Sequence, residues 1–242
     1  MPLHVGAANF YKISSHKQSS LKMVKIDLSE RRFEEFSCED DVLKVLLGGR
    51  CLGVGLLARH KSSADPLDPS SMLVIAVGGL AGTGFPLANR LTMVFRSPLT
   101  RTVAWTQTEG YAAYELAGLG VNALVITGSA DRLSYLLIGS KGVSLFDGEN
   151  LRGLGAVQTC AKLKQVYGDC RVLAMGPAGE RMVKISTVVN DMGRASGVRH
   201  GVGAVFGLKN LKAIVLKGRK HEFRWPHNPL RFTRLLRIFK NG

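Results

Sequence analysis

Short apolar segments separated by glycines recur in this chain in one order, and that order leaves few folds open. VIAVGGLAG (74–82) precedes the strand-like RLTMVFR, and NALVITG (122–128) follows. Later VLAMGPAG (172–179) precedes MVKISTVV, and KAIVLKG (212–218) follows. Matching glycines are 50 residues apart in the first series and 42 in the second. The recurrence indicates either two related halves that share one site, or glycine turns repeated by chance.

Apolar periodicity predicts an alternation of strands and helices along the chain. We expect strands near 23–28, 72–77, 90–96, 122–127, 133–138, 171–175, 182–189 and 212–217. We expect helices near 39–47, 51–59, 111–117 and 154–166. The tail 228–242 also reads as a helix, because Phe232, Leu235, Leu236 and Phe239 form one apolar stripe. That stripe favours packing against further protein, with a membrane-surface or RNA-binding helix as the alternative.

The excess of basic residues is concentrated in the flanks of the chain. Residues 1–22 hold three lysines and no acidic residue, and 219–242 hold seven basic residues and one glutamate. The centre, 23–218, has 23 basic and 17 acidic side chains. A nucleic-acid function is therefore poorly supported by the overall charge of +15 alone.

The cysteines Cys38, Cys51, Cys160 and Cys170 have no C-x-x-C or zinc-finger spacing. No motif for secretion stands out, which favours reduced thiols and a cytoplasmic protein. No apolar run reaches the roughly eighteen residues of a membrane span. Residues 1–22 read as a disordered extension or as a start placed too early, because a clean strand opens at Met23.

Two glycine motifs imitate a dinucleotide-binding fingerprint without its context. GVGLLA (53–58) and GLGVNA (118–123) both fit G-x-G-x-x-A. That fingerprint needs a strand before the glycines and a helix after them. Both motifs instead follow helical segments, and Gly118 reads as a helix C-cap. The chain also has no evident nucleophile–base arrangement, so we assign no catalytic residue.

The segment NDMGRASGVRHGVG (190–203) is the strongest binding candidate. Consecutive N–H groups of glycine-rich backbone form concave sites for anions, and arginine adds a fork that matches phosphate. The segment suits a phosphate or a polyanionic cofactor, and a tight packing loop with solvated arginines is the alternative. Arg90 is a second candidate, because a glycine and proline turn places it at the start of a strand.

Six blocks of the sequence, taken in order, resemble the N-terminal domain of the tungsten-containing aldehyde ferredoxin oxidoreductases. The resemblance covers about residues 23–218 and implies an α+β fold of two related β-rich halves with a few short helices. The blocks are LGGRCLGVGLL (47–57), AVGGLAGTGFP (76–86), FRSPLT (95–100), EGYAAYELAGLGVNALVITG (109–128), GPAGERMVKISTVVND (176–191) and GRASGVRHGVGAVFGLKNLKAIVLKG (193–218).

The resemblance implies a site for a bis-pterin tungsten or molybdenum cofactor whose phosphates are bridged by Mg²⁺. Arg90 matches an arginine between the pterin and an iron–sulfur cluster, and Arg194 and Ala195 match the phosphate-side pair. Gln107 stands where the family commonly has a magnesium-binding asparagine, so Gln107 and the Ala195 carbonyl are the implied magnesium ligands. Glu109 replaces a usual glycine and brings negative charge near the phosphates. The implied cofactor-binding set is Arg90, Gln107, Glu109, Gly110, Arg194, Ala195 and Gly197.

The resemblance divides the chain into a terminal extension (1–22), a pterin-binding domain (23–218) and a basic linker with the first helix of a following domain (219–242). It implies oxidation of an aldehyde to a carboxylic acid, with electrons passing through a [4Fe–4S] cluster to ferredoxin. The cluster cysteines would lie in further domains or in a separate chain, so we expect this chain to be inactive alone. A homodimer is one assembly that the resemblance allows. The alternative is a non-catalytic basic protein that binds nucleic acid or an anionic surface through its flanks.

Overall fold

The computed structural model describes residues 21–38, 45–60, 65–197, 199–218, 226 and 228–241. The first half contains β1 (Leu21–Asp27), β2 (Arg32–Cys38), α2 (Gly49–Arg59), β3 (Leu73–Val77), β4 (Arg90–Arg96), β5 (Val103–Glu109), α3 (Ala112–Gly118) and β6 (Ala123–Thr127). The second half contains β7 (Ser134–Gly139), β8 (Gly142–Asp147), η1 (Glu149–Leu151), α4 (Ala156–Tyr167), β9 (Arg171–Met175), α5 (Pro177–Glu180), β10 (Val188–Asn190), β11 (Ala195–Ser196), α6 (Val202–Leu208) and β12 (Leu211–Lys217). Helix α7 (Pro229–Asn241) follows.

The two halves have the same topology, which confirms the predicted α+β fold of two related β-rich halves. The first sheet has the strand order β2-β1-β6-β3-β4-β5, and the second has β8-β7-β12-β9-β10-β11. Each strand of the first sheet thus corresponds to the strand six numbers later. The pairing directions also agree, since β1–β6 and β7–β12 are parallel and the other pairs are antiparallel.

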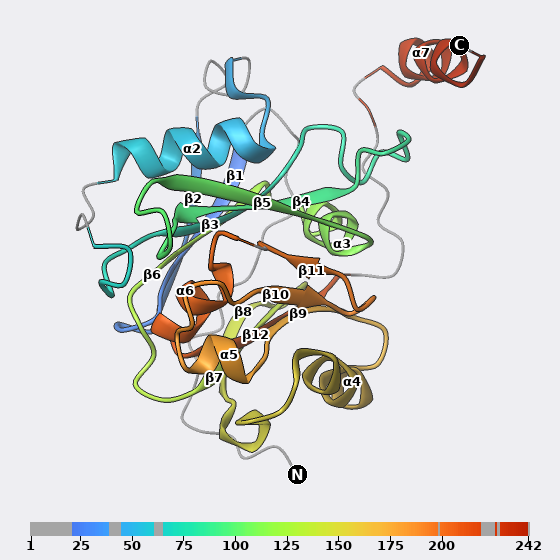
Figure 1. The fold of residues 1–242 in the computed structure, drawn as a ribbon. Helices are drawn as coiled ribbons and strands as arrows, with labels where there is room; N and C mark the ends of the chain where they lie inside the picture. The colour runs from blue at the N-terminus through green and yellow to red at the C-terminus, as the bar shows by residue number, and fades with distance from the viewer. Residues whose placement is uncertain are drawn as a thin grey trace.

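Helices occupy equivalent places in the two halves and build a layered structure (Figure 1). Helix α2 covers the outer face of the first sheet and α4 covers the outer face of the second. The short helices α3 and α6 lie in the inner layer, where their apolar residues join both sheets in one buried cluster. Close packing in this fold needs glycine, since a Cβ on Gly53 of α2 would lie 2.5 Å from Val94 Cγ2.

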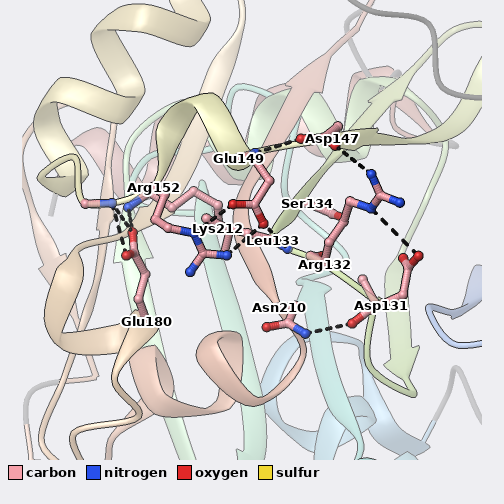
Figure 2. Close-up of polar contacts among 12 residues, drawn as sticks. Asp131, Arg132, Leu133, Ser134, Asp147, Glu149, Arg152, Glu180, Asn210 and Lys212 are labelled. Atoms are coloured by element: carbon pink, nitrogen blue, oxygen red, sulfur yellow. Dashed lines mark hydrogen bonds and ion pairs between the residues drawn. The ribbon is translucent and has the colours of Figure 1, made fainter.

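A polar network closes the second half near α4, as Figure 2 shows. The Lys212 ammonium is fully buried, is paired with the Glu180 carboxylate and donates to the Leu154 carbonyl. Both Glu180 oxygens also accept from the Gly153 amide at 3.1 Å. A buried ion pair persists when hydrogen bonds satisfy its remaining groups, and these contacts do so. The network therefore fixes the turn before α4 against β12.

Several strand predictions were incomplete, and one was wrong in most of its length. Strands β2, β5, β8 and β11 were not predicted, and neither were the short helices η1, α5 and α6. Residues 182–187 were predicted as strand but form turns, and only 188–190 pair in the sheet. Met182 has a φ of 51° and its amide bonds back to the Gly179 carbonyl, which ends α5 in a turn rather than opening a strand.

The glycine motifs that imitate a dinucleotide fingerprint lie away from any strand-to-helix turn, as expected. Gly53 lies inside α2, and Gly118 is the last residue of α3 rather than its cap. The left-handed residue after α3 is Gly120, with a φ of 74°. Its amide and that of Val121 bond back to Ala117 and Leu116, which is a Schellman motif.

The predicted terminal helix is present as α7, and Phe232 and Phe239 contact Phe85 with ring centroids 6.0 and 5.1 Å away. Most of its other apolar side chains are exposed. Of the expected extension 1–22, residues 21 and 22 belong to β1 and the others lie outside the described residues. Of the helix expected at 39–47, only 45–47 are described, and 45–46 are helical. No helix in the described part of the chain is long and apolar enough to cross a membrane.

Candidate anion-binding site

The candidate site lies where the edge strands of the two sheets meet. Strand β5 ends the first sheet, and β11 ends the second. An open groove of about 560 Å³ runs between them. From the first half it is lined by residues 100 and 102–107, and from the second by Ala195, Ser196, Gly197 and His200. The groove is therefore shared by both halves.

Two arginines from different halves converge on one carboxylate beside this groove. Arg90 begins β4 and stands opposite Glu109 of β5 in the strand register. Its Nη2 lies 3.5 Å from Glu109 Oε1. Arg194, just before β11, places Nη1 2.5 Å from Glu109 Oε2. All three side chains are about half exposed, which leaves the arginines open to a ligand in solution.

Gln107 joins this cluster from the same face of β5, because alternate residues of a strand share a face. Its Oε1 accepts from Arg90 Nη1 at 3.5 Å, and its Nε2 donates to Thr92 Oγ1 at 3.4 Å. Gln107 also lines the groove. The structure thus brings together Arg90, Gln107, Glu109 and Arg194, four of the seven residues singled out from the sequence.

Ala195 lies across the groove from Gln107 and presents its backbone. The Asn190 amide bonds to the Arg194 carbonyl, and Ala195 pairs with Val189 in the antiparallel ladder. Bonded and non-bonded residue pairs alternate in such a ladder. The Ala195 carbonyl therefore points away from β10, and no donor to it is found among the described residues.

The two glycines of the predicted set are required by packing. Gly110 has a φ of 109°, and a Cβ there would lie 2.8 Å from Met192 Sδ. Gly197 has a φ of 79°, and a Cβ would lie 2.4 Å from Val202 Cγ1. Gly197 also lines the groove. Both glycines adopt a positive φ and lie directly against side chains of neighbouring segments, where a Cβ would not fit without a shift.

Asn190 is a site residue that the sequence reasoning missed. It is 2% exposed and makes four hydrogen bonds. Its Nδ2 donates to Thr108 Oγ1 and to the Glu109 carbonyl, and its Oδ1 accepts from the amides of Met192 and Arg194. Asn190 therefore ties β5 of one half to the turn that carries Arg194 in the other. The NDMG sequence is typical of such a turn and was the available signal.

The predicted anion nest over 190–203 is only partly present. Residues 202–208 form α6, and Gly203 is buried in it with Thr187 O 2.7 Å from where a Cβ would lie. Gly203 thus serves helix packing, not ligand binding. Arg199 is exposed with a φ of 76°, and the His200 carbonyl accepts from Ser97 Oγ at 2.8 Å. Residues 195–197 and 200 of the segment line the groove, and the part from Val202 onward forms α6.

Protein side chains form no metal cluster in the part of the chain that the structure describes. No group of three or more His, Cys, Asp or Glu comes together there. Burial raises the pKa of Cys160 to about 12 and also raises the pKa of Cys170. Both thiols therefore stay protonated at neutral pH and are not poised as metal ligands or nucleophiles.

The fold and the groove define an α+β domain of two equivalent halves, with two arginines paired to one glutamate beside the seam. Residues 23–218 match the family model described as aldehyde ferredoxin oxidoreductase, N-terminal domain. The chain belongs to this family.

Two relatives and one solved structure show the extent of the similarity. The tungsten-containing aldehyde ferredoxin oxidoreductase of Pyrococcus furiosus is 35% identical over 202 residues, which are 82% of this chain and 33% of the relative. The enzyme of the same name from Pyrococcus horikoshii is 36% identical over the same shares. The active site complex BamBC of benzoyl coenzyme A reductase aligns over 91% of this chain and 34% of that chain, with 28% identity and a TM-score of 0.85. This chain therefore spans about a third of the length of the proteins it matches.

Proposed function

We propose that this chain is the tungstopterin-binding part of an aldehyde:ferredoxin oxidoreductase-type enzyme. In this proposal residues 23–218 form the cofactor domain, and the flanks connect it to the rest of the enzyme. Further domains or a separate chain supply the [4Fe–4S] cluster, and this chain is inactive without them. The substrate is an aldehyde and the electron acceptor is ferredoxin, as the names of the relatives suggest.

The observation that carries the proposal is the convergence of Arg90 and Arg194 on one carboxylate at the groove. Guanidinium groups bind phosphate in the same planar geometry in which they bind a carboxylate. The Glu109 oxygens therefore stand in for the oxygens of a ligand phosphate. The arginines come from different halves, so such a ligand would sit on the seam between the two sheets.

The residues present fit a phosphate-bearing cofactor with its cation. Arg90 and Arg194 would hold the phosphates, and Gln107 Oε1 and the Ala195 carbonyl are the oxygen ligands that Mg²⁺ prefers. Gly197 lines the groove and Gly110 directly follows Glu109, so both would set the course of the backbone beside the ligand. When bound, the cofactor supplies the two-electron chemistry, because protein side chains alone offer none. The chain itself binds, orients and electrostatically supports the cofactor.

The proposal is tested by Arg194→Glu in the complete enzyme, purified with its cofactor. The substitution places a second carboxylate against Glu109 and removes one phosphate ligand, so we expect loss of nearly all bound tungsten. Metal analysis by mass spectrometry measures this directly. Arg32→Glu is the matched control, since Arg32 is an exposed arginine of β2 at the opposite edge of the first sheet. Full tungsten occupancy in Arg194→Glu protein would refute the assignment.

A further inference from the structure

Glu109 is the one acidic side chain that contacts both arginines among the described residues of the site. Its carboxylate gives Oε1 to Arg90 and Oε2 to Arg194. This is the arrangement that a bridging phosphate would adopt with the same two guanidinium groups. We propose that Glu109 is an internal anion that occupies the phosphate position, so that an incoming phosphate must displace it. The inference rests on the proposed function for the identity of the ligand, but not for the competition itself.

The position of Glu109 is set by the fold rather than by chance contact. Strand register places Glu109 directly opposite Arg90 on the neighbouring strand β4. The Glu109 carbonyl also accepts from the buried Asn190 Nδ2 at 2.8 Å. Asn190 in turn holds the amide of Arg194 at 2.9 Å. One buried asparagine thus fixes both the acid and the arginine of the other half, which keeps the carboxylate within reach of both guanidinium groups.

The exposure of the three side chains makes the carboxylate displaceable. Arg90, Glu109 and Arg194 are 46%, 53% and 59% exposed. Ion pairs at such exposure are screened by water and contribute little each. A doubly charged phosphate therefore competes successfully with a single carboxylate for two arginines. Glu109 lowers the affinity of the site without closing it, and the expected effect is about tenfold.

A purely structural role for Glu109 makes a different prediction. If the carboxylate only joined the two halves, its removal would lower the thermal stability and leave anion affinity unchanged or weaker. If it occupies the phosphate position, removal of its charge raises anion affinity. The sign of the change in affinity therefore separates the two roles.

The test is a calorimetric titration of the full chain with sodium pyrophosphate in buffer free of divalent cations. We expect Glu109→Gln to bind pyrophosphate about tenfold more tightly than the wild-type chain. Glu34→Gln is the matched control, because Glu34 is an exposed glutamate paired with Arg32 on β2, at the far edge of the same sheet. That variant removes the same charge and should leave the affinity within about twofold.

A double variant tests whether the gain in pyrophosphate affinity depends on Arg194. In an Arg194→Gln background, the effect of Glu109→Gln should fall to about twofold or less, because half of the anion site is gone. Unchanged or weaker binding by Glu109→Gln would overturn the proposal, and so would absence of pyrophosphate binding in both Glu109→Gln and the wild-type chain. Pyrophosphate carries no pterin, so a gain here combined with full tungsten retention in the Arg194→Glu enzyme would refute the proposed function alone.

Discussion

Lys209 provides a quantitative test of the packing between the two halves. It follows α6, and its side chain is completely buried. Its Nζ donates to the carbonyls of Ser71 at 2.6 Å and Gly128 at 3.1 Å, both in the first half. Burial lowers the pKa of Lys209 from 10.5 to about 8, because the charged form loses its hydration. Substitution by methionine keeps the length of the side chain and removes the titrating amine.

The lowered pKa fixes the sign of the pH dependence. Below pH 8 the amine is charged in both the folded and the unfolded chain, and the folded state bears the full desolvation penalty. Between pH 8 and 10.5 the folded chain releases this proton while the unfolded chain keeps it. The unfolded state then binds more protons, so the Lys209 contribution to stability rises with pH. The full penalty is on the order of 3 kcal/mol, and about 1 kcal/mol of it is recovered between pH 7 and 9.

Urea unfolding at pH 7, 8 and 9, followed by circular dichroism, measures this contribution as a difference between proteins. The free energy of unfolding of the wild-type chain should rise relative to that of Lys209→Met by about 1 kcal/mol across this range. The comparison with Lys209→Met is needed because the buried thiols of Cys160 and Cys170 have raised pKa values. These thiols make the stability of both proteins fall as the pH rises, and taking the difference between the proteins removes this effect. Lys141→Met, which removes an exposed lysine, should run parallel to the wild type. If the free energy of unfolding of Lys209→Met changed with pH in parallel with that of the wild type, the reasoning would be refuted.

Two further substitutions test the close packing of the second half and the support of the site. Gly207→Ala in α6 would bring a Cβ within 2.0 Å of the Gly179 carbonyl and should destabilise the chain by about 2–3 kcal/mol in urea unfolding. Gly78→Ala is the control, because no heavy atom outside its neighbours in the chain lies within 4 Å of where its Cβ would be, and it should change stability little. Equal losses of stability in the two variants would contradict this account. Asn190→Ala removes four hydrogen bonds and should cost about 2–3 kcal/mol. The same variant should weaken pyrophosphate binding, because the turn that carries Arg194 loses its hydrogen bonds to the Asn190 side chain. Unchanged affinity would show that the turn keeps its conformation without these bonds.

The central strands of both halves could be predicted from sequence because both faces of each are buried. Residues 73–77 and 123–127 of the first half are buried throughout, as are 172–175 and 213–216 of the second, and their apolar runs are unambiguous. The edge strand β5 was missed because its inward residues include Thr106 and Thr108, which read as polar. The segment 182–187 was mistaken for a strand because its apolar residues alternate, although Val183 and Ile185 are 41% and 62% exposed.

The candidate site could be predicted only as separate residues. Arg90 and Arg194 are over a hundred positions apart, and no local pattern shows that both reach Glu109. Their association depends on the meeting of β5 with β11, which is a tertiary contact between sheet edges. Asn190 was missed for a related reason, since its importance lies in bonds to Thr108 and Glu109 of the other half.

The two halves share a topology, but the site at their seam is asymmetric. Strand β4 begins with Arg90, whereas its counterpart β10 begins with Val188. The second arginine comes instead from the turn before β11. Each half thus contributes one guanidinium from a non-equivalent position, and neither half alone can offer the pair. A duplicated scaffold supplies two sheet edges that meet, and residues at the ends of β4 and β5 and in the turn before β11 provide the chemistry. Substitutions in the buried central strands should therefore act mainly on stability, and substitutions at the strand ends and turns that carry Arg90, Glu109 and Arg194 should act mainly on anion affinity.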